Sequence, residues 1–218
     1  MSRTVKTRSY SGEGRRAAAA ERRRRILHAA LEMFAAQGYA GTSMGAVARR
    51  AGVALDTVYA LVGRKPELVL AVHDLVLGEE ATDVDGQPLP ALQRRYVAAV
   101  RAAPDARSKI QTYAAALAGL LPRTAPLMEA LREAGETDEG CRRVWESVDE
   151  RRAANMRLFA ADLRATGELR DDLTDDDVAD LVWSMNAPGY YTALARRGWE
   201  PERYAALVAD VWTRTFLR

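Results

Sequence analysis

Two short helical segments meet at a glycine turn, Ala51-Gly52-Val53, and this junction limits the folds open to residues 26–70. Glycine readily adopts the left-handed backbone conformation that ends one helix and lets the chain turn toward the next. The second segment, residues 54–61, is flanked by arginine, lysine, threonine and tyrosine. A short helix held at a fixed angle, with cations on either side, is the geometry that enters a DNA major groove. The junction therefore predicts a DNA-binding head.

Charge is divided unevenly along the chain. Residues 1–70 hold 13 basic and 5 acidic side chains, whereas residues 71–218 hold 19 basic and 25 acidic ones. Positive charge at the N-terminal end is what neutralising DNA phosphates requires. Chance clustering together with a basic tail is the alternative explanation of the same counts.

Membrane, secretion and metal signals are missing from the sequence. No stretch approaches the roughly 20 apolar residues of a membrane span, and Arg15-Arg16 precede only four alanines, too few for a signal peptide. The single cysteine, Cys141, cannot form an internal disulfide, which suits a reducing cytoplasm. One cysteine and two histidines offer no tight metal-ligand spacing. We therefore expect a cytoplasmic protein that has no metal or cofactor and does not bind a membrane.

The pattern predicts an all-α protein with a three-helix head and a larger helical body. Valine and isoleucine rarely alternate with polar residues, and prolines stand where helices would begin or end. Residues 1–16 are basic and lack an apolar period, which predicts a flexible arm. Residues 17–65 would then form the head and residues 66–218 the body.

Local signals define the helices of the head. The first helix is predicted from about residue 18 to 37, where Gly38 supplies a left-handed residue and Tyr39 folds back onto the last turn. Ser43 is the expected N-cap of the second helix, and Gly52 ends it.

Apolar stripes define the helices of the body. One stripe, from Ile110 to Leu121, is bounded by Pro104 and Pro122, and a long helix is predicted from about 138 to 166. The sequence Asn186-Ala187-Pro188-Gly189 interrupts a later helix. The last helix has the clearest period, with apolar side chains at Tyr204, Leu207, Val208, Val211 and Trp212.

The head resembles the tetracycline-repressor (TetR) family of bacterial transcription factors. The family pattern is an apolar helix ending in Phe-x-x-x-Gly-Tyr, followed by Thr-Ser/Thr, Ala-Gly-Val, Thr-x-Tyr and a lysine. In this chain the pattern appears as Phe34, Gly38-Tyr39, Thr42-Ser43, Ala51-Gly52-Val53, Thr57-Val58-Tyr59 and Lys65. The likeness covers about residues 22–75 and is much weaker over the body. It implies a homodimer, a ligand pocket in the C-terminal body, and release of DNA when the ligand binds.

The matched residues have separate predicted roles at DNA. Hydroxyl and ammonium groups would hold phosphates, Arg64 would add attraction, and the start of the second segment would read bases. Tyr59 could instead be a half-buried core aromatic, and Arg22–Arg25 either a further phosphate contact or a solvated face. The predicted DNA-binding set is Thr42, Ser43, Ala54, Leu55, Asp56, Thr57, Tyr59, Arg64 and Lys65.

Two residues depart from the family pattern where bases would be read. Ala54 stands where many relatives have a serine, so the usual side-chain N-cap is missing. Asp56 replaces a common glycine, and its carboxylate would either accept from a cytosine amine or act as a first-turn acid that the helix dipole favours. These departures affect the operator sequence rather than the fold.

Large side chains in the body mark a candidate ligand site, although ordinary core packing would also explain them. Arg152 falls on the same stripe, where an unpaired charge would be costly, so it would bind an acidic ligand or a partner residue, unless the stripe drifts onto Ala153. First-turn helix acids explain the acidic run 171–177 better than a metal site. The predicted ligand-binding set is Tyr113, Trp145, Arg152, Met156, Phe159 and Trp183.

Dimerisation is expected to use the last two long helices in a four-helix bundle between protomers. Two recognition helices about 34–36 Å apart would match successive major grooves and a palindromic operator. The predicted interface residues are Met185, Tyr190 or Tyr191, Leu207, Val211 and Trp212.

The sequence therefore favours a repressor, a homodimer released from double-stranded DNA by a small-molecule effector. A DNA-binding dimer controlled by a protein partner, or by no ligand, is the alternative. An enzyme on a helical scaffold is disfavoured, because the chain has no Gly-rich phosphate loop, no Ser/His/Asp or Cys/His set and no metal spacing.

Overall fold

The computed structural model describes residues 11–78 and 94–218. Every regular element within these ranges is a helix, and the β-type pairing within them is one isolated bridge between Leu169 and Leu217. The predicted all-α class is thus confirmed. No helix in the described ranges is both long and apolar enough to cross a membrane.

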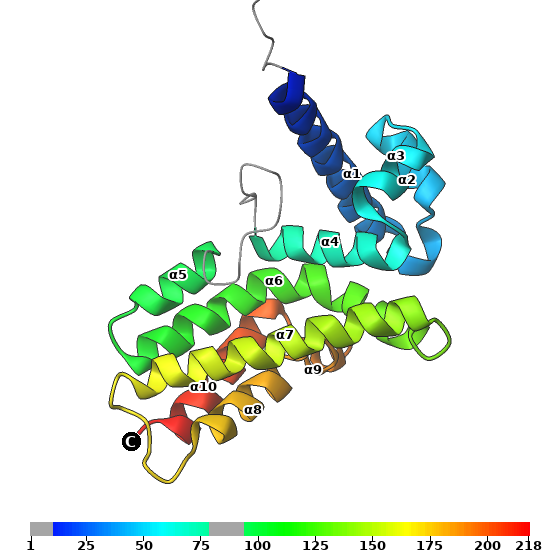
Figure 1. Cartoon of the computed structure of the whole chain (residues 1–218). Helices are drawn as coiled ribbons and strands as arrows, with labels where there is room; N and C mark the ends of the chain where they lie inside the picture. Colours follow the sequence, from blue (N-terminus) through cyan, green and yellow to red (C-terminus); the bar gives the residue numbers. More distant parts are fainter. Residues whose placement is uncertain (1–10, 79–93) are drawn as a thin grey trace, which may run out of the picture.

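The helices form a head and a body joined by one helix that lies between them (Figure 1). The head contains α1 (Ser11–Gly41), α2 (Met44–Ala51) and α3 (Leu55–Val62). The connecting helix is α4 (Lys65–Gly78). The body contains α5 (Arg95–Ala102), α6 (Ala106–Ala134), α7 (Glu139–Arg164), α8 (Asp175–Met185), α9 (Pro188–Ala195) and α10 (Pro201–Phe216).

Helix α1 begins earlier than the sequence pattern predicts. It starts at Ser11 rather than near residue 18, so residues 11–16 of the expected flexible arm are helical. Residues 1–10 of that arm lie outside the described residues. Alanine has the highest helix propensity, and the run of four alanines that follows Arg16 explains this extension.

The expected turns of the head are confirmed. Gly38 has a positive φ of 69°, which bends α1 near its end, and the ring of Tyr39 stacks on Phe34 with centroids 6.4 Å apart. Ser43 caps α2, since its side-chain oxygen accepts from the Ala46 N–H at 3.2 Å. Gly52 ends α2 with a φ of 66°.

Helix α6 continues through Pro122 and Pro126, which corrects the helix boundary predicted at Pro122. A proline inside a helix removes one backbone hydrogen bond to the carbonyl four residues earlier. Pro126 is exposed and Pro122 only half-buried, so water can satisfy the freed carbonyls on this outer face. The opposite face buries Leu121 and Ala125, and this packing keeps the segment helical.

Two apolar cores hold the molecule together. One lies in the body around Tyr113, Phe159 and Trp212. The other joins head side chains such as Phe34 and Val58 to body side chains, which are Leu127, Met128, Leu131, Cys141, Val144 and Val148. The head is therefore packed directly on α6 and α7 rather than linked only through α4.

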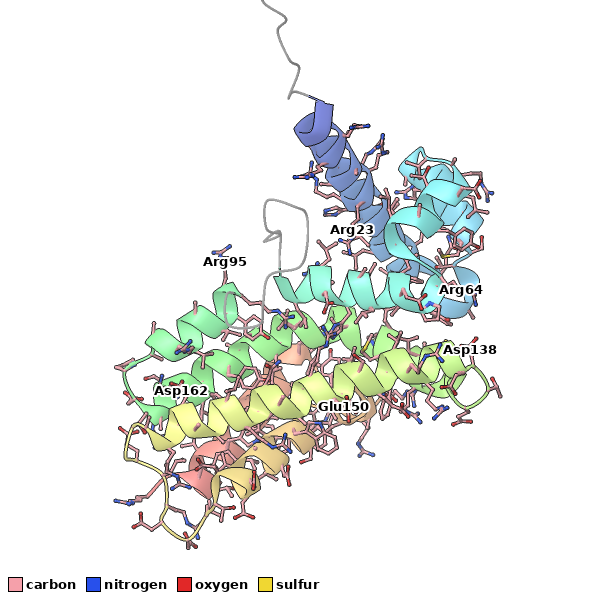
Figure 2. All side chains as sticks on the ribbon, in the orientation of Figure 1. Arg23, Arg64, Arg95, Asp138, Glu150 and Asp162 are labelled. Atoms are coloured by element: carbon pink, nitrogen blue, oxygen red, sulfur yellow. The ribbon has the colours of Figure 1, made fainter. Side chains whose placement is uncertain are left out.

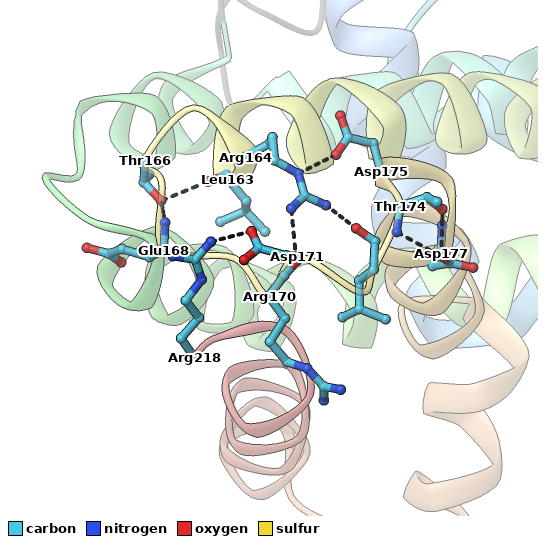
Figure 3. Close-up of polar contacts among 11 residues, drawn as sticks. Leu163, Arg164, Thr166, Glu168, Arg170, Asp171, Thr174, Asp175, Asp177 and Arg218 are labelled. Carbon is cyan, nitrogen blue, oxygen red and sulfur yellow. Dashed lines mark hydrogen bonds and ion pairs between the residues drawn. The ribbon is translucent and has the colours of Figure 1, made fainter.

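Carboxylates of the acidic run 171–177 are used in helix capping and ion pairs (Figure 3). Thr174 and Asp177 form a reciprocal capping box at the start of α8. Asp175 accepts from Arg164 Nε at 2.8 Å, and Asp171 pairs with Arg218. Among the residues with described placement, no group of three His, Cys, Asp or Glu side chains could hold a metal ion.

Candidate DNA-binding surface and ligand cavity

Helix α3 presents a face of large, solvent-exposed side chains. Val58 is fully buried and anchors the helix, whereas Leu55 is 40% and Tyr59 46% exposed. Large apolar side chains left in solvent commonly mark a surface that contacts another molecule. The exposed Tyr59 does not support its alternative role as a half-buried core residue.

The start of α3 lacks a side-chain cap. Ala54 is the N-cap residue and makes no capping hydrogen bond, and Asp56 is exposed in the first turn. Thr57, one residue further, is half-buried. The predicted base-reading residues, Ala54, Leu55 and Asp56, thus lie together at one end of an exposed helix. Side chains at the N-terminal end of a recognition helix are those that reach base edges.

Thr42 is placed where it cannot hold a phosphate, contrary to its predicted role. It is 1% exposed, and its hydroxyl donates to the Gly38 carbonyl at 2.9 Å. Threonine commonly uses its hydroxyl in such local backbone bonds, and here this bond stabilises the bend after α1. Its neighbour Ser43 is exposed, and its oxygen accepts the capping bond from Ala46, which leaves its hydroxyl proton free to donate.

The start of α4 carries the two remaining predicted cations. Arg64 is exposed, while its backbone N–H donates to the Glu67 carboxylate at 2.9 Å (Figure 2). The Nζ of Lys65 lies 4.1 Å from the ring centroid of Tyr39, a cation–π contact. Burial lowers the pKa of Lys65. Arg64 is therefore the freer of the two cations.

Tyr39 also joins the head to the body. Its hydroxyl lies 3.2 Å from Sγ of the buried Cys141, in the first turn of α7. Burial and this hydrogen bond raise the pKa of Tyr39 above its ordinary value. The Cys141 N–H donates to the α7 N-cap, Asp138, at 2.9 Å, so the contact is fixed to a helix terminus.

A cavity of about 830 Å³ lies in the body among residues of α4, α5, α6 and α7. This volume falls within the range of small-molecule sites. Four predicted ligand residues line it, namely Tyr113, Arg152, Met156 and Phe159. Trp145 packs instead on the core shared with the head, and Trp183 lies beneath Arg152, so neither lines the cavity.

Arg152 has protein partners at the edge of this cavity. Its guanidinium donates to Asn186 Oδ1 at 2.9 Å and to the Trp183 carbonyl, and it pairs with Asp149. Burial lowers the pKa of Arg152, although Asp149 opposes this shift. Asn186 in turn donates to the Tyr113 hydroxyl at 2.7 Å. The predicted partner residue of Arg152 is thus present within the chain.

The sequence interpretation missed a second polar cluster in the cavity wall. His73 and Asp74 of α4 are buried beside Arg94, which precedes α5, and Arg151 of α7. The signal was an adjacent histidine and aspartate inside the apolar stretch 68–76. Nothing local in the sequence indicates the two arginines as their partners.

The predicted dimer residues divide into two groups. Met185, Tyr191 and Trp212 are buried in the core of their own protomer, so they are not available to a second chain. They form the inner faces of α8, α9 and α10. Leu207 and Val211 of α10 are only partly buried, and Tyr190, the alternative to Tyr191, is 36% exposed. The helical period correctly found an apolar face of α10, of which Tyr204, Val208 and Trp212 are buried within the protomer.

The family model described as bacterial regulatory proteins, tetR family, matches residues 26–72. Over 90 residues the chain is 38% identical to the HTH-type transcriptional regulator SrpR of Pseudomonas putida, covering 41% of each protein. It is also 38% identical over 90 residues to the uncharacterized HTH-type transcriptional regulator TtgW, likewise of Pseudomonas putida, covering 41% of this chain and 66% of that protein. The chain thus spans less than two thirds of the length of either relative.

A solved structure shares the fold over nearly the whole chain. It is a putative transcriptional regulator from Saccharomonospora viridis in complex with choline, with a TM-score of 0.66 and 17% identity. The likeness covers 90% of this chain and 97% of that one. The matched segment 26–72 contains α2 and α3 with parts of α1 and α4, where the glycine turns and the exposed face of α3 lie. Residues 26–72 of the chain thus belong to the TetR family of bacterial regulatory proteins.

Proposed function

We propose that this protein is a homodimeric transcriptional repressor that binds a palindromic operator and is released from it by a small molecule. In this assignment residues 17–65 bind DNA and residues 66–218 bind the ligand and the second protomer. Membership in a family of regulatory proteins supports the DNA-binding part. The remaining parts depend on the geometry of α3 and of the cavity.

The observation that carries the proposal is the exposed face of α3. Leu55 and Tyr59 are exposed on a helix whose opposite side is fixed by the buried Val58. Thr57, Tyr59 and Arg64 are then the candidates for phosphate contacts, with Ser43 and Lys65 beside them. Thr42 is removed from this set because its hydroxyl is committed to Gly38.

The cavity favours control by a small molecule over control by a protein partner. Its volume of about 830 Å³ and its mostly apolar wall suit a ligand of moderate size. The structural neighbour from Saccharomonospora viridis was solved with choline, so a protein of this fold does bind a small molecule. A ligand that prefers one of two states changes DNA affinity by that preference.

The test is binding to duplexes selected from a random pool, measured by fluorescence anisotropy at about 0.15 M salt. We expect a palindromic duplex to be bound at least about a thousandfold more tightly than random duplex. Footprints of two half-sites in successive major grooves would support the dimer. Equal affinity for selected and random duplexes would contradict the proposal.

A further inference from the structure

The polar cluster in the cavity wall gathers three side chains, His73, Arg94 and Arg151, around the carboxylate of Asp74. Asp74 Oδ1 and Oδ2 lie 3.3 and 3.4 Å from the two terminal nitrogens of Arg151. Arg94 Nη2 lies 3.9 Å from Asp74 Oδ1, and His73 Nδ1 lies 3.5 Å from it. Charge-assisted hydrogen bonds are normally about 2.7–2.9 Å long, so Asp74 satisfies neither guanidinium fully.

Positive charge exceeds negative charge in this cluster. Burial lowers the pKa of His73, so the imidazole is neutral at neutral pH. One carboxylate therefore faces two guanidinium groups. Arg94 is 7% exposed, and its Nε has no hydrogen-bond partner within residues 11–78 and 94–218. A buried donor without a partner is destabilising, and an anionic partner would remove that cost.

Two other charged side chains of the cavity wall are already compensated. Arg152 Nη1 pairs with Asp149, and its Nη2 donates to Asn186 and the Trp183 carbonyl, so its charge is paired although its Nε has no partner among the described residues. Asp162 accepts from Lys109 Nζ at 2.9 Å. The position of Asp162 on α7, toward the far end of the body from the head, is shown in Figure 2. The cluster around Asp74 is thus where the buried wall lacks an anion.

The rest of the wall is mainly apolar. Apart from the cluster, the lining includes Leu117, Leu121, Val148, Leu158 and Phe159. Leu158 is 54% exposed although it lines the cavity, so an apolar group bound there would remove it from water. A cavity with one cationic end and an apolar body matches a molecule with an anionic head and an apolar tail.

We propose that the cavity binds an amphipathic carboxylate, whose head pairs with Arg94 and Arg151 and whose tail lies along Leu117 and Phe159. This inference rests on the proposed function and specifies the chemistry of its effector. A planar carboxylate suits the fork of a guanidinium, which can donate two parallel hydrogen bonds. A cationic ligand is disfavoured at this end because both arginines would repel it.

The same cluster reaches the head. Asp74 attracts Arg23 of α1, a half-buried side chain on the part of α1 above α4 (Figure 2). A second carboxylate bound to Arg94 and Arg151 competes with Asp74 for these arginines. Its binding therefore alters the charge balance at the point where α4 meets α1, and this links the effector to the DNA-binding surface.

The test compares three probes that each carry a straight chain of about ten carbons, by isothermal titration of the whole protein without DNA: decanoate, decan-1-ol and decyltrimethylammonium. We expect decanoate to bind at least about tenfold more tightly than the other two, because only it pairs with the arginines. Equal or tighter binding of the alcohol or the ammonium, or no binding of decanoate, would overturn the inference.

Variants locate the head group. Arg151→Gln and Arg94→Gln are each expected to weaken decanoate binding about tenfold and to leave decanol binding unchanged. Arg101→Gln is the matched control, since Arg101 also lines the cavity but lies at the end of α5 and should not affect decanoate. If Arg94→Gln unfolds, the half-exposed Arg151 still provides the test. Unchanged decanoate affinity in Arg151→Gln would overturn the assignment.

A second arm separates this inference from the proposed function. Decanoate added to the complex with selected duplex is expected to lower the DNA affinity, and Arg151→Gln to reduce that effect. Failure of sequence-specific DNA binding would contradict the repressor assignment while the titrations still decide the ligand chemistry. Decanoate binding without any change in DNA affinity would overturn the link through Asp74.

Discussion

At the scale of single residues, Leu55 and Tyr59 are expected to differ in what they contribute to DNA binding. Leu55 lies at the start of α3, where side chains reach base edges, so Leu55→Ala should change which duplex is bound best. Tyr59 lies one turn later, so Tyr59→Ala should weaken binding to all duplexes by a similar factor, about tenfold. Competition between selected and random duplexes measures both effects.

The control for this pair is Leu158→Ala, because Leu158 is also exposed but lies on α7 in the body. Its DNA affinity and sequence preference should match those of the unmodified protein. A Tyr59→Ala variant that changed only the preferred sequence would show that Tyr59 reads bases rather than phosphates.

His73 is expected to make stability depend on pH. Burial lowers its pKa below 6.5, and Arg151 and Arg94 lower it further, although Asp74 opposes the shift. The unfolded chain then binds a proton at pH values where the folded chain does not, so stability falls as pH decreases below about 6.5. Asp74, whose partners lower its pKa against the effect of burial, stabilises the fold above about pH 3.8, and this stabilisation is lost only as pH falls below that value.

Thermal unfolding at about pH 7.5 and pH 5.5 measures this effect. In His73→Gln the drop in Tm between the two values should be smaller than in the unmodified protein. The matched control is His28→Gln, since His28 is exposed on α1 and should keep the full drop. An equal drop in all three proteins would contradict the role of His73.

At the scale of elements, α6 is expected to gain stability when a proline is removed. Pro126→Ala supplies the N–H that α6 lacks and should raise the free energy of unfolding by about 2 kcal/mol, since alanine also has the highest helix propensity. Chemical denaturation checks this. Pro126 is exposed, so the change leaves the buried face intact. A less stable variant would show that the bend at Pro126 is required for packing.

Sequence signals predicted elements well where a local residue decides the geometry. Gly38, Ser43 and Gly52 each fix a turn or cap through their own backbone or side chain, and the structure confirms all three. The same reasoning was wrong for Pro122, because burial of the opposite face of α6 outweighs the lost hydrogen bond. Tertiary packing of this kind has no signature within a few residues of the proline.

The functional side chains show the same division. The exposure of Ala54, Leu55 and Asp56 follows from the short helix after a glycine turn, so the sequence predicted it. Thr42 was wrongly assigned to phosphate binding, because its hydroxyl donates to the nearby Gly38 carbonyl instead. The cluster around Asp74 depends on α4, α7 and the start of α5, which are far apart in the chain, and no local pattern joins them.

At the scale of the whole molecule, the dimer is expected to depend on the outer face of α10. On α10, Leu207 and Val211 are the predicted interface residues that are only partly buried in the protomer. The double variant Leu207→Glu/Val211→Glu should yield monomers, because it places like charges in an apolar contact. Sedimentation equilibrium measures the mass, and DNA affinity should fall with it.

The control is Ala206→Glu/Asp210→Asn, which changes two exposed positions of the same helix. This variant should remain dimeric if α10 contacts the second protomer only through Leu207 and Val211. A dimer that survives both double variants would place the interface on another helix.

The contact between Tyr39 and Cys141 places the only thiol of the chain where its reactivity reports separation of the head from the body. Cys141 is 1% exposed and lies where α1 contacts α7, with the Tyr39 hydroxyl next to its sulfur. A disulfide reagent can reach this thiol only when α1 separates from α7. The rate of thiol modification therefore reports how often that separation occurs, in the way that amide exchange reports local unfolding. Burial also raises the pKa of the thiol, which keeps modification slow while α1 and α7 stay in contact. The rate at which Cys141 is modified in the protein without added labels thus measures how often the head separates from the body.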